Sequence, residues 1–299
     1  ANKAKKMHRS GFVNIIGNPN VGKSTLMNAL VGEKLSIITS KAQTTRHRIM
    51  GIVSGEDFQI VYSDTPAIMK PSYKLQESMM KFVTGALTDA DVILYVTDTV
   101  EQSERSAEIV DSIRRSGIPT VVVINKIDLS TPEALEALVD KWQAEIPGAQ
   151  VVPTSAKENF NIEGLFRTIL SLLPEGPAFY PKDTLTDKTL RFFASEIIRE
   201  KILKFYDKEI PYCCEIEIES YKEEPTIDRI AATIYVARDS QKGILIGHKG
   251  EKLKRVGQTA REDMEQFLGK KVFLQLFVKV SDDWRNNERQ LRRFGYEQE

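Results

Sequence analysis

The sequence predicts two domains: an α/β domain with a mostly parallel, doubly wound sheet, followed by a smaller α+β domain. In the first half, apolar strands alternate with amphipathic helices, which is typical of doubly wound sheets. In the second half, a long helix precedes two strands, another helix and a strand. Between the halves, a helix ends in the proline and glycine cluster at 172–177. We expect a disordered lead at 1–10, domains at 11–173 and 181–299, and a linker at 174–180.

Composition favours an intracellular protein. The chain has 299 residues, 42 lysines and arginines and 42 aspartates and glutamates, so the net charge points to no partner. Its two cysteines, Cys213 and Cys214, are adjacent and unsuited to an ordinary disulfide, which indicates a reducing compartment. No apolar run approaches the roughly 18 residues of a membrane helix. We expect a cytoplasmic protein with no transmembrane segment, and leave a peripheral membrane contact open.

A phosphate-binding loop follows the first apolar strand, Phe12 to Ile16. The segment from Gly17 to Ser24 reads GxxxxGKS and precedes an amphipathic helix. Backbone N–H groups and the helix N-terminus would hold α and β phosphates, while Lys23 would reach the β and γ phosphates. The alternative is a plain glycine turn. The expected nucleotide contacts are Gly17, Asn18, Pro19, Asn20, Val21, Gly22, Lys23, Ser24 and Thr25.

Two further segments suit the γ phosphate and a metal ion. The strand from Ile60 to Ser63 ends at Asp64, where an acid can hold Mg²⁺ through a water. Upstream, the segment Gln43 to Arg46 contains two threonines, one of which can bring a hydroxyl to the metal. The expected metal ligands are Ser24, Thr44, Thr45 and Asp64, although each threonine taken singly is more often a surface residue.

A guanine site is predicted where the buried strand from Val121 to Ile124 ends. Asn125-Lys126-Ile127-Asp128 follows that strand, and open α/β sheets bind ligands at such ends. The Asp128 carboxylate can accept from guanine N1–H and the 2-amino group, which adenine does not offer. Asn125 would tie the loop together and face the base, and Lys126 would lay its stem over the base plane. A strand-end turn with a helix cap is the alternative.

A second guanine signal follows the short strand from Val151 to Thr154. It is the tripeptide Ser155, Ala156 and Lys157, in which the Ala156 N–H would donate to guanine O6. The order of these segments closely resembles that of the small GTPases. One departure is Ala67, which replaces the glycine of the family's DxxG element and does not easily reach positive φ. Another is Ile68, which cannot orient water where many GTPases use glutamine, so intrinsic hydrolysis should be slow.

The second domain is predicted from its helix and strand pattern. Asp187 can cap a long helix through about Phe205, and Ile216 and Ile218 alternate with glutamates in a strand. A strand from Ile230 to Val236 follows. The order ends with a helix over 251–267 and a strand over 272–280. We expect Trp284, Phe294 and Tyr296 to pack in the core.

The tetrapeptide Gly247-His248-Lys249-Gly250 resembles the GxxG loop of a KH domain of the bacterial type. Such a loop clamps about four nucleotides of single-stranded nucleic acid beside an aliphatic groove. The stretch 238–261 holds seven lysines and arginines against two acids, although a solvated basic helix face would look similar. The expected RNA contacts are Gly247, His248, Lys249, Gly250, Lys252, Lys254 and Arg255.

Together, the two halves resemble the Era-like GTPases, which have a P-loop GTPase domain and a C-terminal KH-like (type II) domain. Supporting segments are 41–48, 195–201 and 278–280. The resemblance implies a GTPase that uses GTP/GDP and Mg²⁺, binds the 3′ end of small-subunit ribosomal RNA and assists maturation of the small ribosomal subunit. It implies no DNA partner and a monomer. It also implies that Asn20 helps to hold K⁺, with catalytic roles for Asn20, Lys23, Thr44, Thr45 and Asp64.

Two other functions fit the same residues. One is a constitutive RNA-binding protein that binds GTP without useful hydrolysis, because of the altered 64–67 element. The other is a related ribosome-linked or tRNA-linked GTPase, which would need a second G domain or a modifying domain that the chain lacks. Turnover measured with and without RNA separates these functions.

Overall fold

The computed structural model describes residues 6–37, 41, 44–100 and 107–296. Its internal contacts define two compact units. Unit 1 contains residues 1–71 and 79–187, and unit 2 contains residues 72–78 and 188–299, so the division falls after the expected linker. Residues 1–5 of the expected lead and Gln43 lie outside the described part, and the first strand already begins at Arg9, inside that lead.

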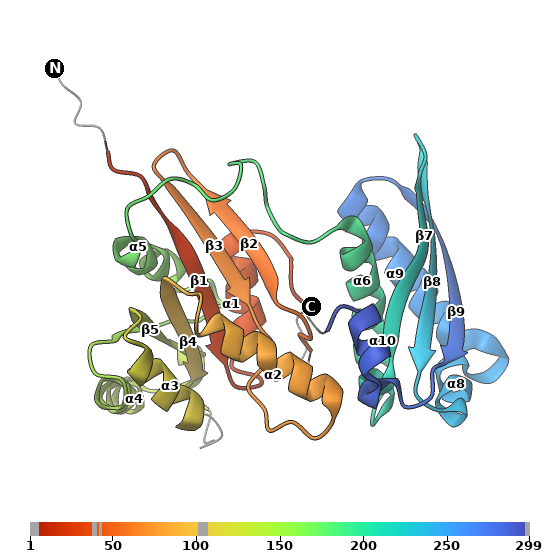
Figure 1. The fold of residues 1–299 in the computed structure, drawn as a ribbon, viewed down its shortest axis with the longest axis horizontal. Helices are drawn as coiled ribbons and strands as arrows, with labels where there is room; N and C mark the ends of the chain where they lie inside the picture. Colours follow the sequence, from red (N-terminus) through yellow and green to blue (C-terminus); the bar gives the residue numbers. More distant parts are fainter. Residues whose placement is uncertain (1–5, 38–40, 42–43, 101–106, 297–299) are drawn as a thin grey trace. The chain divides into compact units, whose positions relative to one another are not determined.

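Unit 1 is built on a six-stranded sheet in the order β2-β3-β1-β4-β5-β6 (Figure 1). Every strand pair is parallel except β2 with β3, which confirms the predicted doubly wound sheet. The strands are β1 Arg9–Gly17, β2 Ile49–Ser54, β3 Phe58–Asp64, β4 Val92–Asp98, β5 Thr120–Asn125 and β6 Gln150–Pro153. The helices are α1 Lys23–Val31, α2 Lys74–Ala86, α3 Ala107–Ser116, α4 Pro132–Glu145 and α5 Ile162–Leu172, with a short 3₁₀ turn, η1, at Ile127–Leu129. Residues 74–78 at the start of α2 belong to unit 2.

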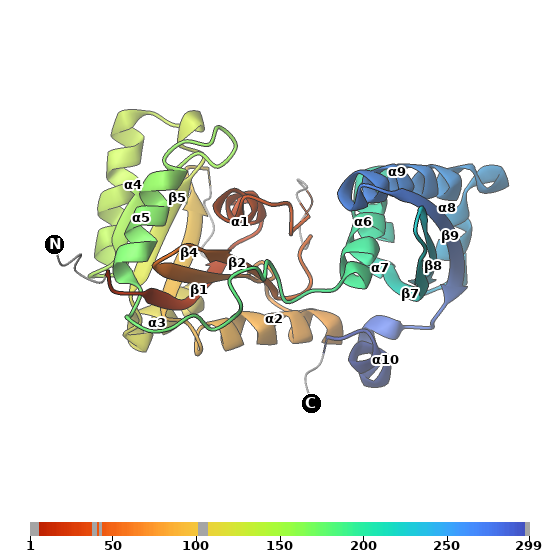
Figure 2. The same ribbon diagram turned by 90° about the horizontal axis from the view of Figure 1, so that it is seen from above.

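The core of unit 1 lies between the sheet and its helices. Helices α2, α3 and α4 contribute to a cluster that includes Val83, Ile113 and Trp142, with Tyr95 and Val122 from the sheet. Figure 2 shows α1 and α2 on opposite sides of the sheet. Because the strands are covered on both faces, their side chains are almost all buried, as expected for a parallel sheet.

Unit 2 has a three-stranded sheet in the order β7-β8-β9, in which β7 and β8 are antiparallel and β8 and β9 parallel. The strands are β7 Glu215–Glu223, β8 Ile227–Val236 and β9 Lys271–Val280. The helices are α6 Leu190–Phe205, α7 Ile210–Cys213, α8 Asp239–Ile246, α9 Glu251–Leu268 and α10 Glu288–Arg293, with 3₁₀ turns η2 His248–Gly250 and η3 Trp284–Asn286. Helices α6 and α9 lie together against the sheet (Figure 1).

Two expectations for unit 2 had different outcomes. Trp284 and Tyr296 are buried, and the Trp284 Nε1–H donates to the Cys213 carbonyl at 2.7 Å, so core packing is confirmed for both. The expected Asp187 cap is wrong. Thr189 caps α6, because its side chain accepts from the Phe192 N–H, whereas Asp187 accepts from the Met50 N–H at 3.0 Å. A sequence cannot distinguish two capping-type residues two positions apart.

Candidate functional site

The glycine loop passes so close to β5 that its second glycine has no room for a side chain. Gly22 is left-handed, with φ 87°, and a Cβ there would lie 2.2 Å from Asn125 Nδ2. Helix α1 begins at the next residue, Lys23, and no side chain caps its first N–H groups. Uncapped N–H groups at a helix start bind anions, so the loop is suited to phosphate.

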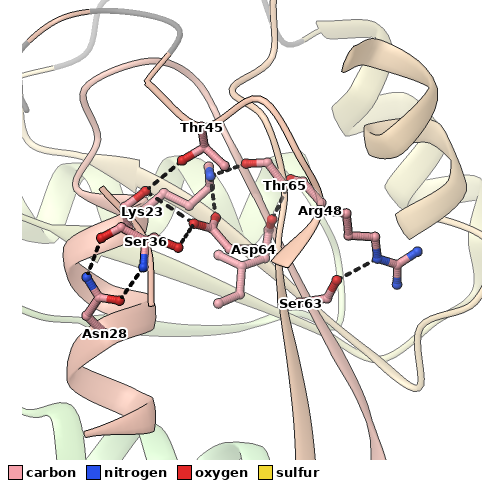
Figure 3. Close-up of polar contacts among 10 residues, drawn as sticks. Lys23, Asn28, Ser36, Thr45, Arg48, Ser63, Asp64 and Thr65 are labelled. Carbon is pink, nitrogen blue, oxygen red and sulfur yellow. Dashed lines mark hydrogen bonds and ion pairs between the residues drawn. The ribbon is translucent and has the colours of Figure 1, made fainter. Parts of the chain in front are cut away.

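Lys23 and Asp64 form a buried ion pair beside this loop (Figure 3). The Lys23 Nζ lies 2.5 Å from Asp64 Oδ1 and also donates to the Thr65 carbonyl. The other carboxylate oxygen, Oδ2, accepts from Ser24 Oγ at 3.2 Å and from Ser36 Oγ at 2.9 Å. Sequence reasoning missed Ser36, because a serine between two apolar residues carries no motif.

The two candidate threonines have different environments. The Thr45 hydroxyl lies 3.2 Å from Ser24 Oγ, and Thr45 is buried, whereas the Thr44 hydroxyl donates to the Lys41 carbonyl at 2.7 Å. The structure therefore gathers Ser24, Thr45 and Asp64 and leaves Thr44 outside the group. Two hydroxyls and a carboxylate are hard oxygen donors, which fit a magnesium ion that keeps waters and phosphate oxygens as its other ligands.

Asn125 connects the glycine loop with the segment after β6. Its Nδ2 donates to the Val21 carbonyl at 2.9 Å, and its Oδ1 accepts from the Ala156 N–H at 2.9 Å and from the Thr154 hydroxyl at 3.2 Å. This is the tying role that the sequence predicts for Asn125. The Ala156 N–H, expected to face guanine O6, donates to Asn125 in this structure.

Asp128 and Lys126 lie on the exposed side of that junction. The Asp128 carboxylate is exposed and accepts from Ser155 Oγ at 2.8 Å. Lys126 adopts a left-handed conformation, and its Nζ lies 2.8 Å from Asp98 Oδ2 and donates to the Asn20 carbonyl. Asp98 is a contact that sequence reasoning missed, although it ends β4 next to β5. Lys157 is exposed, whereas Asn18 is buried in the glycine loop.

The unusual residues after Asp64 fit their surroundings. Ala67 is not among the described residues with positive φ, so alanine causes no backbone strain in this conformation. The Ile68 side chain is buried in the cluster on the α2 side of the sheet, and its N–H donates to the Gly17 carbonyl at 2.9 Å. Ile68 therefore packs in the core and cannot orient a water.

The GxxG loop of unit 2 has the backbone that its glycines predict. Gly247 and Gly250 have φ values of 76° and 74°, and Lys249 between them is also left-handed, with φ 52°. Beside the loop lies a groove of about 390 Å³ between α9 and β9. Its lining residues are Gly250, Leu253, Lys254, Gly257, Gln258, Arg261, Leu274 and Leu276. An aliphatic groove next to a glycine loop is suited to single-stranded RNA.

The predicted basic residues divide between this groove and two aromatic residues at the end of helix α6. Lys254 lines the groove, whereas Lys252 and Arg255 lie over the rings of Tyr206 and Phe205, at 5.6 and 4.0 Å from the ring centroids. Gln258 and Arg261 line the groove but were not predicted. They follow Lys254 by four and seven residues, a spacing that places all three on one face of a helix. This spacing is a signal in the sequence that could have identified them.

Comparisons with known proteins agree with both halves. The family model "50S ribosome-binding GTPase" matches residues 12–126, and the model "KH domain" matches residues 209–285. GTPase Era of Staphylococcus haemolyticus is 45% identical over 97% of this chain and 97% of the relative. GTPase Era of Alkaliphilus metalliredigens is 45% identical over 97% of this chain and 99% of the relative.

Two solved structures resemble the whole chain. One is a variant of Aquifex aeolicus Era bound to GDP·AlF4⁻, and the other is Era in complex with MgGDPNP and nucleotides 1506–1542 of 16S ribosomal RNA. Each has a TM-score of 0.93 and is 40% identical in sequence. Each match covers 97% of this chain and 100% of the solved chain. With the phosphate loop, the guanine-type loops and the GxxG groove in place, these matches show that the chain belongs to the Era family of GTPases.

Proposed function

We propose that this protein is a GTP-controlled RNA-binding switch that binds the 3′ end of 16S ribosomal RNA through unit 2 and assists maturation of the small ribosomal subunit in the cytoplasm. The observation that carries the proposal is the 40% identical Era structure that contains both MgGDPNP and nucleotides 1506–1542 of this RNA. No helix in the described part of the chain is long and apolar enough to cross a membrane. The active form is a monomer, and its RNA partner lies in the small ribosomal subunit.

The nucleotide is held by three groups of residues. The loop from Gly17 to Thr25 surrounds the phosphates with N–H groups. When the nucleotide binds, the Lys23 ammonium leaves Asp64 and contacts phosphate oxygens. Asp128 reads the guanine N1–H and 2-amino groups, and its bond from Ser155 supports that orientation. Lys126, held by Asp98, covers the base plane. Asn125 fixes the distance between the phosphate and base ends of the site.

Magnesium is held by Ser24, Thr45 and Asp64, the last through a water. When bound, Mg²⁺ neutralises negative charge on the β and γ phosphates. Thr45 is chosen over Thr44 because its hydroxyl already lies 3.2 Å from Ser24 Oγ. Asn20 would hold a potassium ion beside the phosphates, and such an ion would supply positive charge there. Since Ile68 is buried and cannot orient water, Lys23 stabilises the transition state, and hydrolysis without a partner is slow.

RNA binding uses the GxxG loop and the groove between α9 and β9. Lys254 and Arg261 contact phosphates at the groove, while Leu274 and Leu276 contact bases. His248 and Lys249 are exposed at the loop, where they face the RNA backbone. GTP contacts order the loops around Thr45 and Asp64, hydrolysis releases them, and RNA access changes with that order.

The test is crosslinking of RNA to the protein in living cells, followed by identification of the bound RNA. The proposal expects reads concentrated at the 3′ end of 16S ribosomal RNA. Reads spread over unrelated transcripts would instead support a constitutive RNA-binding protein. Measured GTP turnover with and without that RNA separates the two further, because the constitutive alternative has no useful turnover in either case.

A further inference from the structure

The outward face of the edge strand β9 carries a regular row of aromatic and basic side chains. Lys271, Phe273, Gln275, Phe277 and Lys279 alternate with residues that face the helices, and all five are exposed. Phe273 is 44% and Phe277 49% exposed, although core strands normally bury such rings. A strand rise of about 3.3 Å per residue places the two rings about 13 Å apart. That distance allows each ring to take a different base.

The neighbouring strand adds a cation to this row. Arg229 on β8 pairs in register with Phe273, and its guanidinium lies 5.6 Å from the Phe273 ring centroid. The same face of β7 presents Lys222 opposite Arg229. Lys271 and Lys279 form no ion pair within the described residues, and β9 contains no acid. Arg229 also pairs with Glu224, just beyond the end of β7, at 3.2 Å, and both side chains are exposed. On β7 itself, Glu217 is paired with Arg293 at 2.7 Å.

The other end of this sheet face is covered by the chain itself. Arg293 at the end of α10 contacts the Tyr235 hydroxyl at 3.3 Å, the Phe294 ring lies 5.5 Å from the Tyr235 ring, and the Tyr296 hydroxyl donates to Glu215. The C-terminal segment therefore contacts the start of β7 and the end of β8, whereas Phe273, Gln275 and Phe277 are exposed. This residual face adjoins the GxxG groove across one strand, since Leu274 and Leu276 line the groove from β9.

We propose that Phe273 and Phe277, flanked by Lys271, Lys279 and Arg229, form a second RNA surface on which bases of single-stranded RNA leaving the GxxG groove stack. Aromatic rings with interleaved cations suit this ligand, because any base can stack on a ring while lysine and arginine neutralise phosphates. Because the row is positively charged, it would repel a basic partner protein. The inference rests on the proposed RNA-binding function and extends it over the edge of the sheet.

The test measures the affinity of labelled nucleotides 1506–1542 of 16S ribosomal RNA by fluorescence anisotropy. Loss of one base–ring stack is expected to weaken binding about 5-fold to 160-fold, so F273A and F277A should each lower the affinity by at least 5-fold. The double variant should lower it further, and F273W/F277W should restore it. The matched control is F267A, since Phe267 is 50% exposed but lies on α9.

Folding is controlled separately. Both rings are about half exposed, so F273A/F277A should keep the melting temperature and the GTP turnover of the parent. Irradiation of the complex should also crosslink nucleotides directly to Phe273 or Phe277, as read by mass spectrometry. In addition, K271A/K279A should reduce the slope of log affinity against log salt by about 0.7 per lost contact.

The inference is overturned if F273A/F277A binds this RNA like the parent and no adduct maps to either ring. It is also overturned if RNA affinity is unchanged while binding to purified small ribosomal subunits falls, because the face would then contact a protein. The GxxG-loop variant H248D/K249D distinguishes the proposed RNA-binding function from the second RNA surface. If only H248D/K249D loses the RNA, the proposed function holds and the second surface fails. If the RNA does not bind the parent, both fail.

Discussion

The Lys23 ammonium lies 2.5 Å from Asp64 Oδ1, and both side chains are buried. The lysine of the phosphate loop therefore holds the carboxylate that is proposed to serve the metal. Because each charge is compensated mainly by the other, removal of one leaves a buried charge without its partner. Such removals destabilise proteins by several kcal/mol.

Replacing Lys23 should affect folding as well as nucleotide binding. We expect K23M to lower the free energy of unfolding by about 3–5 kcal/mol, because Asp64 would keep only hydroxyl partners. Urea unfolding of the protein without added nucleotide measures this. K81M, an exposed lysine on α2, is the matched control and should change stability by less than about 0.5 kcal/mol. Equal stability of K23M and the parent would contradict the ion pair.

The two threonines give a matched pair of variants for the metal site. T45A should raise the magnesium concentration needed for half-maximal GTP turnover, because its hydroxyl lies beside Ser24. T44A should leave that concentration unchanged, because its hydroxyl bonds to the Lys41 carbonyl. Magnesium titrations of turnover compare the two. A larger effect of T44A would place the metal ligand at Thr44.

Asp128 should determine the base. D128N is expected to weaken GTP binding and to favour xanthosine triphosphate, whose 2-oxo group can accept from the new amide. A competition titration with both nucleotides measures the preference. D140N provides a control, because Asp140 lies on α4 of the same unit. If D128N keeps the parent's preference for GTP, Asp128 does not read the base.

Potassium dependence tests hydrolysis without a catalytic glutamine. Asn20 is exposed in the glycine loop with φ 64°, and a cation held there would add positive charge for the transition state. GTP turnover should be faster in potassium than in sodium at equal ionic strength. N20A should remove that difference while leaving turnover in sodium nearly unchanged. Equal rates of the parent in the two salts would argue against a potassium site.

The fold was predictable because its signals are local. The loop from Gly17 to Ser24 and the turn after Ile124 are short segments whose spacing places them at strand ends. The choice of Thr45 over Thr44 was not predictable, since adjacent residues differ only in the direction that the folded backbone gives them. Ser36 and Asp98 reach the site through tertiary packing and carry no motif.

In unit 2, the sequence did not show which face of helix α9 or of strand β9 each side chain occupies. As basic residues, Lys252 and Arg255 are equivalent to Lys254 in the sequence, but the helix turns them toward the rings of Phe205 and Tyr206 at the end of α6. The sequence of β9 predicts a strand, but only the order of strands in the sheet shows which of its faces is exposed to solvent. The sequence alone therefore does not distinguish Phe273 and Phe277 from the other residues of this strand.

The central claim is that unit 2 binds RNA through its GxxG loop while unit 1 binds GTP. The most direct measurement is the affinity of H248D/K249D for nucleotides 1506–1542 of 16S ribosomal RNA, with GTP binding measured on the same protein. Both side chains are exposed, and the two glycines with positive φ are retained, so the loop should keep its backbone. The account predicts RNA affinity lowered by at least about tenfold, because one lysine contact to phosphate is lost and two carboxylates repel the RNA backbone, with unchanged GTP affinity. RNA affinity equal to the parent's would contradict it.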